Sequence, residues 1–204
     1  MALRNILVED EENEFLRKVS REVKNVDDRI RGILDDMLET MYDDSGVGLA
    51  AVQVGILRRL VVIDVTPILK EEIEIIDQKM EKELGGRNDE QEKARLADEK
   101  AEKERMLAYG VLKLVNPVIV ESEGEERDME GCLSMPGLQG LVKRPRWVRV
   151  RSLDEYGNEK EYTATGILKK AFCHELDHLD GILYRDRADE MYVITDDGLV
   201  PENK

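Results

Sequence analysis

The hydrophobic positions of this chain form separate helix-like and strand-like patterns along its length. After Asp27, a residue typical of a helix cap, apolar residues follow the 3, 4, 7 spacing of an amphipathic helix that ends near Tyr42. A shorter helix is predicted over residues 12–24. A further helix is predicted over residues 166–180, where Gly181 stands at the position of a C-terminal cap.

Strand patterns occupy much of the remaining chain. Residues 60–64 read as a buried strand, and residues 111–122 as a strand that Asn116-Pro117 interrupts. Residues 147–153 and 159–165 flank a turn sequence and predict a β-hairpin. Because strands and hairpins precede a late helix, without β-α-β alternation, the pattern favours an α+β fold over a doubly wound sheet.

Residues 66–108 differ from the rest of the chain because charged residues dominate and apolar residues are sparse. A compact domain does not need so long a polar stretch between two strands. We therefore interpret 1–204 as one catalytic domain that carries 66–108 as a charged, helical insertion, which Gly85-Gly86 would divide into two halves. A solvated charged helix and partial disorder are the alternatives. The tail from Arg185 is acidic and shows no clear pattern.

Composition limits the classes of function. The chain has 204 residues and a formal net charge of −15, which argues against sequence-independent binding to nucleic acid or to an anionic membrane. The N-terminus has no apolar segment typical of a secretory signal, and no apolar run approaches the roughly 20 residues of a membrane span. With only Cys132 and Cys173, thiols or metal ligation in a reducing cytoplasm are favoured over a disulfide.

The strongest chemical signal is the sequence His174-Glu175-Leu176-Asp177-His178, an H-E-x-x-H box within the last predicted helix. Side chains at positions i and i+4 lie on one face of a helix, so both imidazoles can bind one divalent ion. The glutamate between them can act as a general base on a metal-activated water. The chain contains only two histidines, and both are in this box.

A catalytic site of this kind needs a third ligand. Cys132 lies between glycine and leucine in a loop or at a strand end, where a thiolate can face a metal. Cys173 directly precedes His174 and points about 100° away around the helix, so it is better explained as a packed apolar thiol. Gln53, a polar amide inside the apolar loop 46–55, must either find an internal partner or face a ligand.

Three blocks together resemble the bacterial peptide deformylase family. They are Gly46-Val47-Gly48-Leu49-Ala50-Ala51-Val52-Gln53, Glu130-Gly131-Cys132-Leu133-Ser134, and His174-Glu175-Leu176-Asp177-His178. The resemblance implies a mixed, mostly antiparallel β-sheet around a central helix that carries the H-E-x-x-H box. It also implies a hydrolase that removes the formyl group from N-terminal formyl-methionine of new polypeptides and releases formate.

The resemblance assigns a role to each matching position. It implies Cys132, His174 and His178 as metal ligands, Glu175 as the general acid and base, and Gln53 with the Leu133 backbone N–H as oxyanion donors. Substrate-binding residues would be Gly46, Val47, Gly48, Gly131, Ile167 and Ala171. The metal would be Fe(II), with Ni, Co or Zn as substitutes. Partners would be formyl-methionyl nascent peptides in the cytoplasm, with the ribosome and a protein partner of the insertion left open.

The chain departs from the family pattern at three places. Lys170 occupies a position of the methionine pocket that is often aliphatic, and Gln139 stands where many relatives carry a basic residue. The acidic tail has no counterpart of the basic C-terminal segment that some relatives use at the ribosome. Two other classes of protein remain as alternatives. They are a zinc protease with the same box, and a metal-binding or interaction protein in which the insertion is the functional part.

Overall fold

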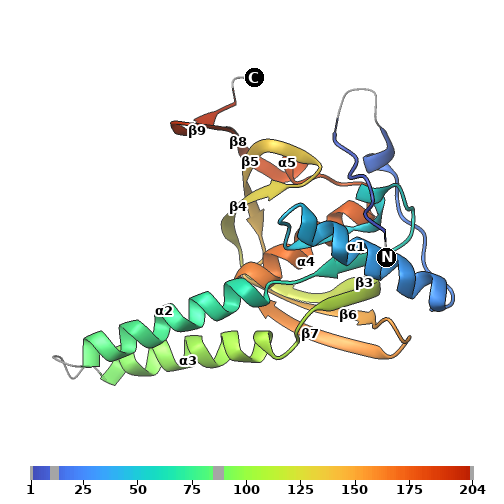
Figure 1. The fold of residues 1–204 in the computed structure, drawn as a ribbon. Helices are drawn as coiled ribbons and strands as arrows, with labels where there is room; N and C mark the ends of the chain where they lie inside the picture. Colours follow the sequence, from blue (N-terminus) through green and yellow to red (C-terminus); the bar gives the residue numbers. More distant parts are fainter. Residues whose placement is uncertain (1, 10–13, 85–89, 203–204) are drawn as a thin grey trace. The chain divides into compact units, whose positions relative to one another are not determined.

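The computed structural model describes residues 2–9, 14–84 and 90–202, and the chain divides into two compact units. The first unit comprises Met1–Ile63 and Leu112–Lys204, and the second comprises Asp64–Val111. The first unit contains η1 (Glu14–Arg17), α1 (Asp28–Asp43), β1 (Gly48–Ala50), η2 (Ala51–Val54), β2 (Leu60–Ile63), β3 (Leu112–Glu123), β4 (Glu126–Cys132), β5 (Met135–Arg144), β6 (Trp147–Leu153), β7 (Glu159–Thr165), α4 (Gly166–Leu179), α5 (Tyr184–Arg187), β8 (Ala188–Thr195) and β9 (Gly198–Pro201). Figure 1 labels most of these elements.

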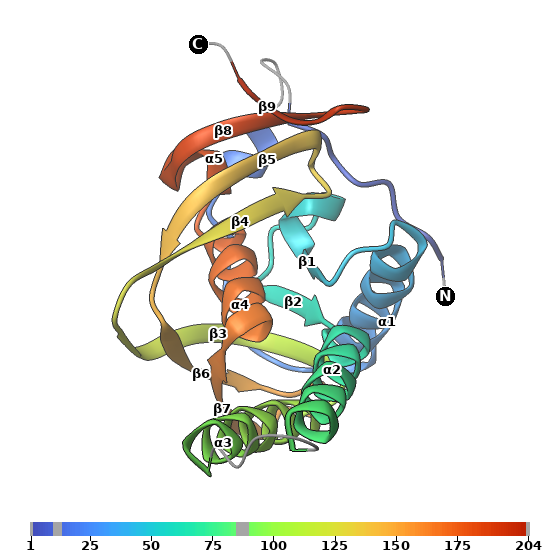
Figure 2. The ribbon, with the colours of Figure 1, turned by 90° about the vertical axis from the view of Figure 1, so that its left-hand side faces the viewer.

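The strands of the first unit form two antiparallel sheets, one in the order β1-β2-β3-β6-β7 and one in the order β4-β5-β8-β9. Figure 2 shows α4 in the middle of the unit, with β4 and β5 above it, β2 to its right, and β3 and β6 below it. Most of α4 is buried, including both of its histidines. The predicted α+β fold, with a mostly antiparallel sheet around the box-bearing helix, is therefore confirmed.

Helix α1 closes the first sheet on one side, and its position follows from its sequence. The Asp27 side chain caps the helix by accepting a hydrogen bond from the Ile30 backbone N–H at 2.9 Å. The apolar stripe predicted from the spacing is buried at Leu34, Met37 and Met41, which pack in one cluster with residues of β1 and β2. This cluster fixes the loop between α1 and β1, on which Gly46 lies.

Two expectations about local structure are wrong. Residues 14–24 contain only the short 3₁₀ helix η1, followed by extended chain, and residues 12 and 13 lie outside the described residues. The acidic tail does have regular structure, because β8 pairs with β5 and β9 pairs with β8. Among the described residues, no helix is both long and apolar enough to cross a membrane.

The second unit contains two helices, α2 (Thr66–Leu84) and α3 (Glu90–Leu107). The two helices contact each other through apolar residues such as Ile76 and Leu96, which are buried. Ion pairs join them along their length, with Lys100 Nζ 2.6 Å from Asp77 Oδ1 and Lys103 Nζ 2.9 Å from Glu72 Oε2. Apolar side chains are few, so cross-helix ion pairs supplement a narrow apolar seam.

Candidate active site

A pocket of about 590 Å³ lies beside α4 in the first unit. Eleven of the residues singled out in the sequence line it: Gly46, Val47, Gly48, Gln53, Gly131, Cys132, Leu133, Ile167, Ala171, His174 and Glu175. The twelfth, His178, is 1% exposed and lies one helical turn beyond His174 on α4. Residues from three separate parts of the sequence thus meet at one place.

Cys132, His174 and His178 form a cluster that could hold a metal ion. Their ligand atoms all lie within 4.8 Å of one another, and Cys132 Sγ is 3.2 Å from His178 Nε2. The two imidazole rings, on successive turns of α4, have centroids 4.9 Å apart. Within the described part of the chain, this is the only group of three or more such residues that could hold a metal ion.

A buried ion-pair network fixes the orientation of His174. Its Nδ1 lies 2.9 Å from Glu130 Oε2, and because an ionised carboxylate only accepts, Nδ1 is the donor and Nε2 is left available to bind a metal. Arg144 donates to Glu130 from Nε at 2.7 Å and to Asp177 at 2.6 Å. Burial would raise the pKa of Glu130, but bonding to Arg144 and His174 prevails and lowers it to about 2, so Glu130 stays ionised.

Glu175 is the carboxylate that faces the pocket. It is 5% exposed, and burial raises its pKa to about 7, which keeps it near the balance between its two protonation states. Among the described residues, its Oε2 has no hydrogen-bond partner. The backbone at Gly48 lies directly against it, since a Cβ there would be 2.5 Å from Glu175 Oε1. Gly48 is therefore needed for the close approach of β1.

The Gln53 amide is held in place from both ends. Its Oε1 accepts from the Ala50 backbone N–H at 2.8 Å. Its Nε2 is 3.2 Å from Ser134 Oγ and 3.5 Å from Cys132 Sγ. The amide therefore donates to Ser134 and to Cys132, and only the second of these belongs to the ligand cluster. Leu133 lies in the turn between β4 and β5, next to Cys132, and also lines the pocket.

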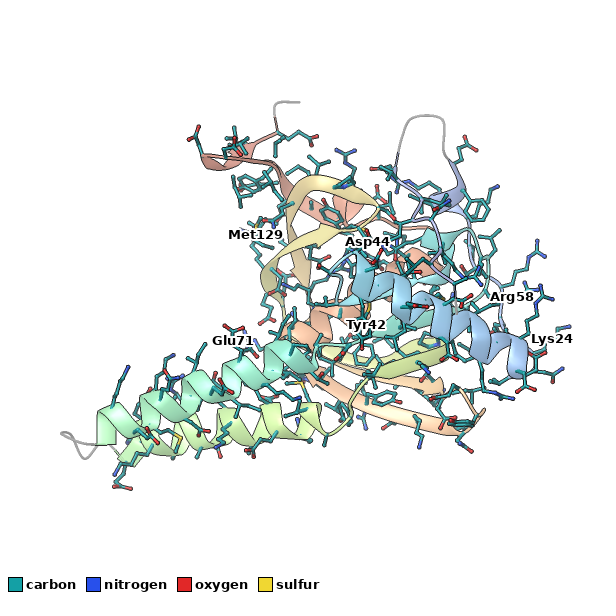
Figure 3. All side chains as sticks on the ribbon, in the orientation of Figure 1. Lys24, Tyr42, Asp44, Arg58, Glu71 and Met129 are labelled. Atoms are coloured by element: carbon teal, nitrogen blue, oxygen red, sulfur yellow. The ribbon has the colours of Figure 1, made fainter. Side chains whose placement is uncertain are left out.

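Apolar side chains form the wall of the pocket on α4. Ile167 and Ala171 lie one turn apart on this wall, with Lys170 beside them. Lys170 Nζ donates to the Met129 carbonyl oxygen at 3.1 Å, which holds the ammonium charge at β4. Met129 is labelled in Figure 3. The methylene chain of Lys170 borders the pocket. Gln139, where many relatives carry a basic residue, also lines the pocket.

The two cysteines have different surroundings, and both are free thiols. Cys173 is 4% exposed on α4, and burial raises the pKa of its thiol to about 11. It stays neutral and apolar, as its position next to His174 predicted. Cys132 is less buried and faces the two histidines.

Several residues of the site had no assigned role in the sequence. Glu130 could have been found, since an acidic residue directly before Gly131-Cys132 is unusual in a buried strand end. Arg144 gave no local signal, because its partner is 14 residues away and meets it only through the pairing of β4 with β5. Ile194 reaches the pocket from β8, which the sequence pattern did not reveal.

The donor set fits a divalent metal ion. One thiolate and two imidazoles suit borderline metals, and three protein ligands leave a coordination position for water or substrate. Glu130 supplies the outer hydrogen bond that usually orients a metal-binding histidine. The buried, unpartnered oxygen of Glu175 beside this set is placed to exchange a proton with a water there. The arrangement could hold a metal ion beside a buried carboxylate, as hydrolytic metal centres do.

Comparisons with known proteins agree with this geometry. The family model "Polypeptide deformylase" matches residues 4–193. The chain is 41% identical over 188 residues to a peptide deformylase of Acetivibrio thermocellus, covering 92% of this chain and 85% of that protein. It is also 41% identical over 191 residues to "Peptide deformylase 2" of Clostridium acetobutylicum, covering 93% and 98%.

Solved structures give the same result at the level of the fold. A peptide deformylase from Ehrlichia chaffeensis in complex with actinonin superposes with a TM-score of 0.70 at 33% identity, covering 93% of this chain and 90% of that one. A peptide deformylase from Legionella pneumophila gives 0.67 at 34% identity, covering 92% and 87%. This chain therefore belongs to the polypeptide deformylase family, metal-dependent hydrolases that remove N-formyl groups from nascent polypeptides.

Proposed function

We propose that Glu175, Gln53 and the Leu133 backbone N–H carry out the deformylation of N-terminal formyl-methionine in this protein. The observation that carries the proposal is the meeting of Cys132, His174 and His178 beside a buried carboxylate whose pKa is raised to about 7. A carboxylate poised near neutral pH can both accept and return a proton during one turnover.

The proton path runs through Glu175. A water attacks the formyl carbon, and Glu175 accepts the proton that this water loses. Glu175 then gives the proton to the departing amine as the carbon–nitrogen bond breaks. The products are formate and a free α-amine, and Glu175 returns to its starting state. Its burial favours this role, because burial raises the pKa of the carboxyl and the buried Oε2 has no hydrogen-bond partner among the described residues.

The Gln53 side chain and the Leu133 backbone N–H stabilise the oxyanion that forms when water attacks. The fixed position of the Gln53 amide supports this role, because its Oε1 is already bound and its Nε2 faces Cys132. A preorganised donor of this kind lowers the barrier by about 3 kcal/mol in well-studied hydrolases.

The substrate is held by its side chain and by its backbone. We assign the methionine side chain to the wall formed by Ile167 and Ala171 on α4. The peptide backbone would pair with residues 46–48 on one side and with Gly131 on the other, as a peptide does when it adds a strand to a sheet edge. The retention of the Lys170 ammonium at Met129 keeps the pocket wall apolar.

Cys132, His174 and His178 would hold one divalent ion, and we propose Fe(II), with Ni, Co or Zn as substitutes. When bound, such an ion lowers the pKa of a water and polarises the formyl oxygen. Elemental analysis of protein purified without oxygen should find about one ion per chain. Loss of activity in air would support iron, because Fe(II) and a thiolate are both oxidisable.

The substrate also suggests where the protein acts. Formyl-methionine occurs on nascent chains, so we infer that the protein works in the cytoplasm and meets its substrate at the ribosome. The second unit, Asp64–Val111, holds none of the site residues and is available for a protein partner. The net charge of −15 argues against direct binding to nucleic acid.

The replacement Glu175→Gln tests the proton path. It keeps the shape of the side chain but removes its ability to accept a proton, so kcat on formyl-Met peptides should fall by about a thousandfold. Metal content should stay the same, because Glu175 is not among the ligands. Formate release and elemental analysis on the same preparation measure both quantities.

The exposed Glu159 provides a matched control, since Glu159→Gln on β7 makes the same chemical change far from the ligands and should not alter kcat. Near-normal turnover by Glu175→Gln would contradict the mechanism. An assay of formylated against unblocked peptides separates the proposal from the alternative of a zinc protease. A protease would cleave internal peptide bonds of both.

A further inference from the structure

Ile194 brings the C-terminal ribbon of β8 and β9 to the active-site pocket. Strand β8 pairs with β5 in a register that places Val193 opposite Leu138 and Tyr192 opposite Gln139. Because side chains alternate along a strand, Ile194 and Tyr192 share the sheet face of Gln139. Ile194 and Gln139 both line the pocket that contains the Cys132 and Glu175 side chains.

Ile194 is an apolar pocket residue that remains largely uncovered. It is 49% exposed, and its cross-strand neighbour Leu199 is 46% exposed. Together they form an aliphatic pair on the face of the ribbon that borders the pocket. Exposed neighbouring aliphatic residues at the edge of a binding cleft are typical of a surface that a ligand covers.

The place of Ile194 relative to the reacting groups indicates which part of a substrate covers it. The formyl group is fixed at Cys132 and Glu175, and the methionine side chain is assigned to Ile167 and Ala171 on α4. Ile194 belongs to neither region, because it comes from the strand beyond β5, on a different wall of the pocket. A peptide that leaves the site past Gln139 would bring a later residue to it.

We propose that Ile194, with Gln139 beside it, forms a subsite for the second or third residue of the nascent chain and favours an apolar side chain there. This inference rests on the proposed function, since it assumes a formyl-methionyl peptide in the pocket. A later residue of the same peptide is the expected occupant, because the exposed Ile194 lines the same pocket as Cys132 and Glu175.

The test compares three peptides: formyl-Met-Ala-Ala-Ser, formyl-Met-Leu-Ala-Ser and formyl-Met-Ala-Leu-Ser. The unaltered protein should favour one of the leucine peptides over the alanine peptide by about fivefold in kcat/KM, mainly through KM. Ile194→Ser should remove this preference by lowering kcat/KM on the favoured leucine peptide toward its value on the alanine peptide. Ile194→Lys should instead shift the preference toward a peptide with glutamate at the same position.

Val200→Ser is the matched control. Val200 is 47% exposed on the same ribbon, but it pairs with Val193 and so lies on the opposite face from Ile194. This variant should keep the preference for leucine. Thermal unfolding of the variants checks that the ribbon remains folded, and Ile194→Ala replaces Ile194→Ser if the serine variant unfolds early.

The outcomes separate the two proposals. If no formylated peptide is hydrolysed by the unaltered protein, the proposed function fails. If all three peptides are hydrolysed equally, or if Ile194→Ser and Ile194→Ala keep the leucine preference, the subsite is overturned while the proposed function stands. Equal loss of preference in Val200→Ser would also overturn it, because the effect would then not belong to the pocket face.

Discussion

At the scale of single residues, surroundings rather than residue type decide the chemistry of the two cysteines. Cys173 is buried on α4, and its thiol pKa is raised to about 11. Cys132 ends β4 with its sulfur 3.2 Å from His178 Nε2. Of the two thiols, only Cys132 lies in the cluster of residues that could hold a metal ion.

Replacing each cysteine by alanine should therefore have different effects. Cys132→Ala removes a proposed ligand and should lower metal occupancy at least about tenfold, with a matching loss of deformylation. Cys173→Ala leaves the ligand set intact and should retain full occupancy. It should lower the free energy of unfolding by about 1 kcal/mol, because a buried side chain becomes smaller.

Metal content per chain and kcat, measured on both variants after the same purification, check this prediction. Full occupancy in Cys132→Ala would contradict the assignment of the ligand. Loss of metal from Cys173→Ala, with the fold intact, would show that its burial is not its only role.

The structure brings together the residues that the sequence singled out where chemistry and spacing coincide. His174, Glu175 and His178 follow from helical periodicity, and Cys132 follows from the need for a third ligand. The supporting residues were less accessible. Arg144 reaches Glu130 only because β4 and β5 pair, and Ile194 reaches the pocket only because β8 adds to β5. Such contacts depend on strand register, which a local pattern does not encode.

At the scale of elements, Asn116 joins β3 to the chain before α1. It has a positive φ of 51°, at a place where the pairing of β3 with β6 skips from Val115 to Val118. Its side chain accepts from the Val23 backbone N–H and donates to the Val23 carbonyl oxygen, both at 2.8 Å. Asparagine tolerates the left-handed region, and its amide here replaces a strand partner for Val23.

Two variants separate these contributions. Asn116→Gly keeps the backbone conformation but loses both bonds, so the free energy of unfolding should fall by about 2 kcal/mol. Asn116→Ala loses the bonds and also places a Cβ in the left-handed region, which should cost about 1 kcal/mol more. Urea unfolding of both variants measures the difference. An alanine variant at least as stable as the glycine variant would contradict this account.

Element prediction succeeded where local patterns were strong. The helices at 28–43 and 166–179 have clear apolar stripes and caps. The helix expected over 12–24 was wrong because residues there instead bond to distant chain, as when the Ser20 N–H donates to Leu179 O and Arg21 bridges Arg58. Strands β8 and β9 were missed because charged and apolar residues are mixed in them, and pairing with β5 stabilises them.

At the scale of the whole molecule, the chain combines a catalytic unit with a charged helical unit. Asp64–Val111 begins directly after β2 and ends directly before β3. These two strands are antiparallel neighbours, and Ile63 lies opposite Leu112. Strands β2 and β3 of the first unit therefore form the two strands of a β-hairpin, and the second unit is the connection between them. The sequence indicated such a segment through its composition, but it carried no sign of a partner.

Removing the second unit is the sharpest test of its role. Because Ile63 and Leu112 are directly opposed, the two residues Asn-Gly can replace 64–111 as a tight hairpin turn. All twelve proposed site residues remain, so kcat/KM on formyl-Met-Ala-Ser should stay within about twofold of the full chain. A milder deletion of residues 70–105 serves as the control if the shorter chain is less stable.

Co-sedimentation of the full chain and the shortened chain with ribosomes then measures binding separately from catalysis. Retained activity with lost co-sedimentation would assign partner binding to α2 and α3, whereas lost activity in a folded protein would show that the helical unit contributes to catalysis.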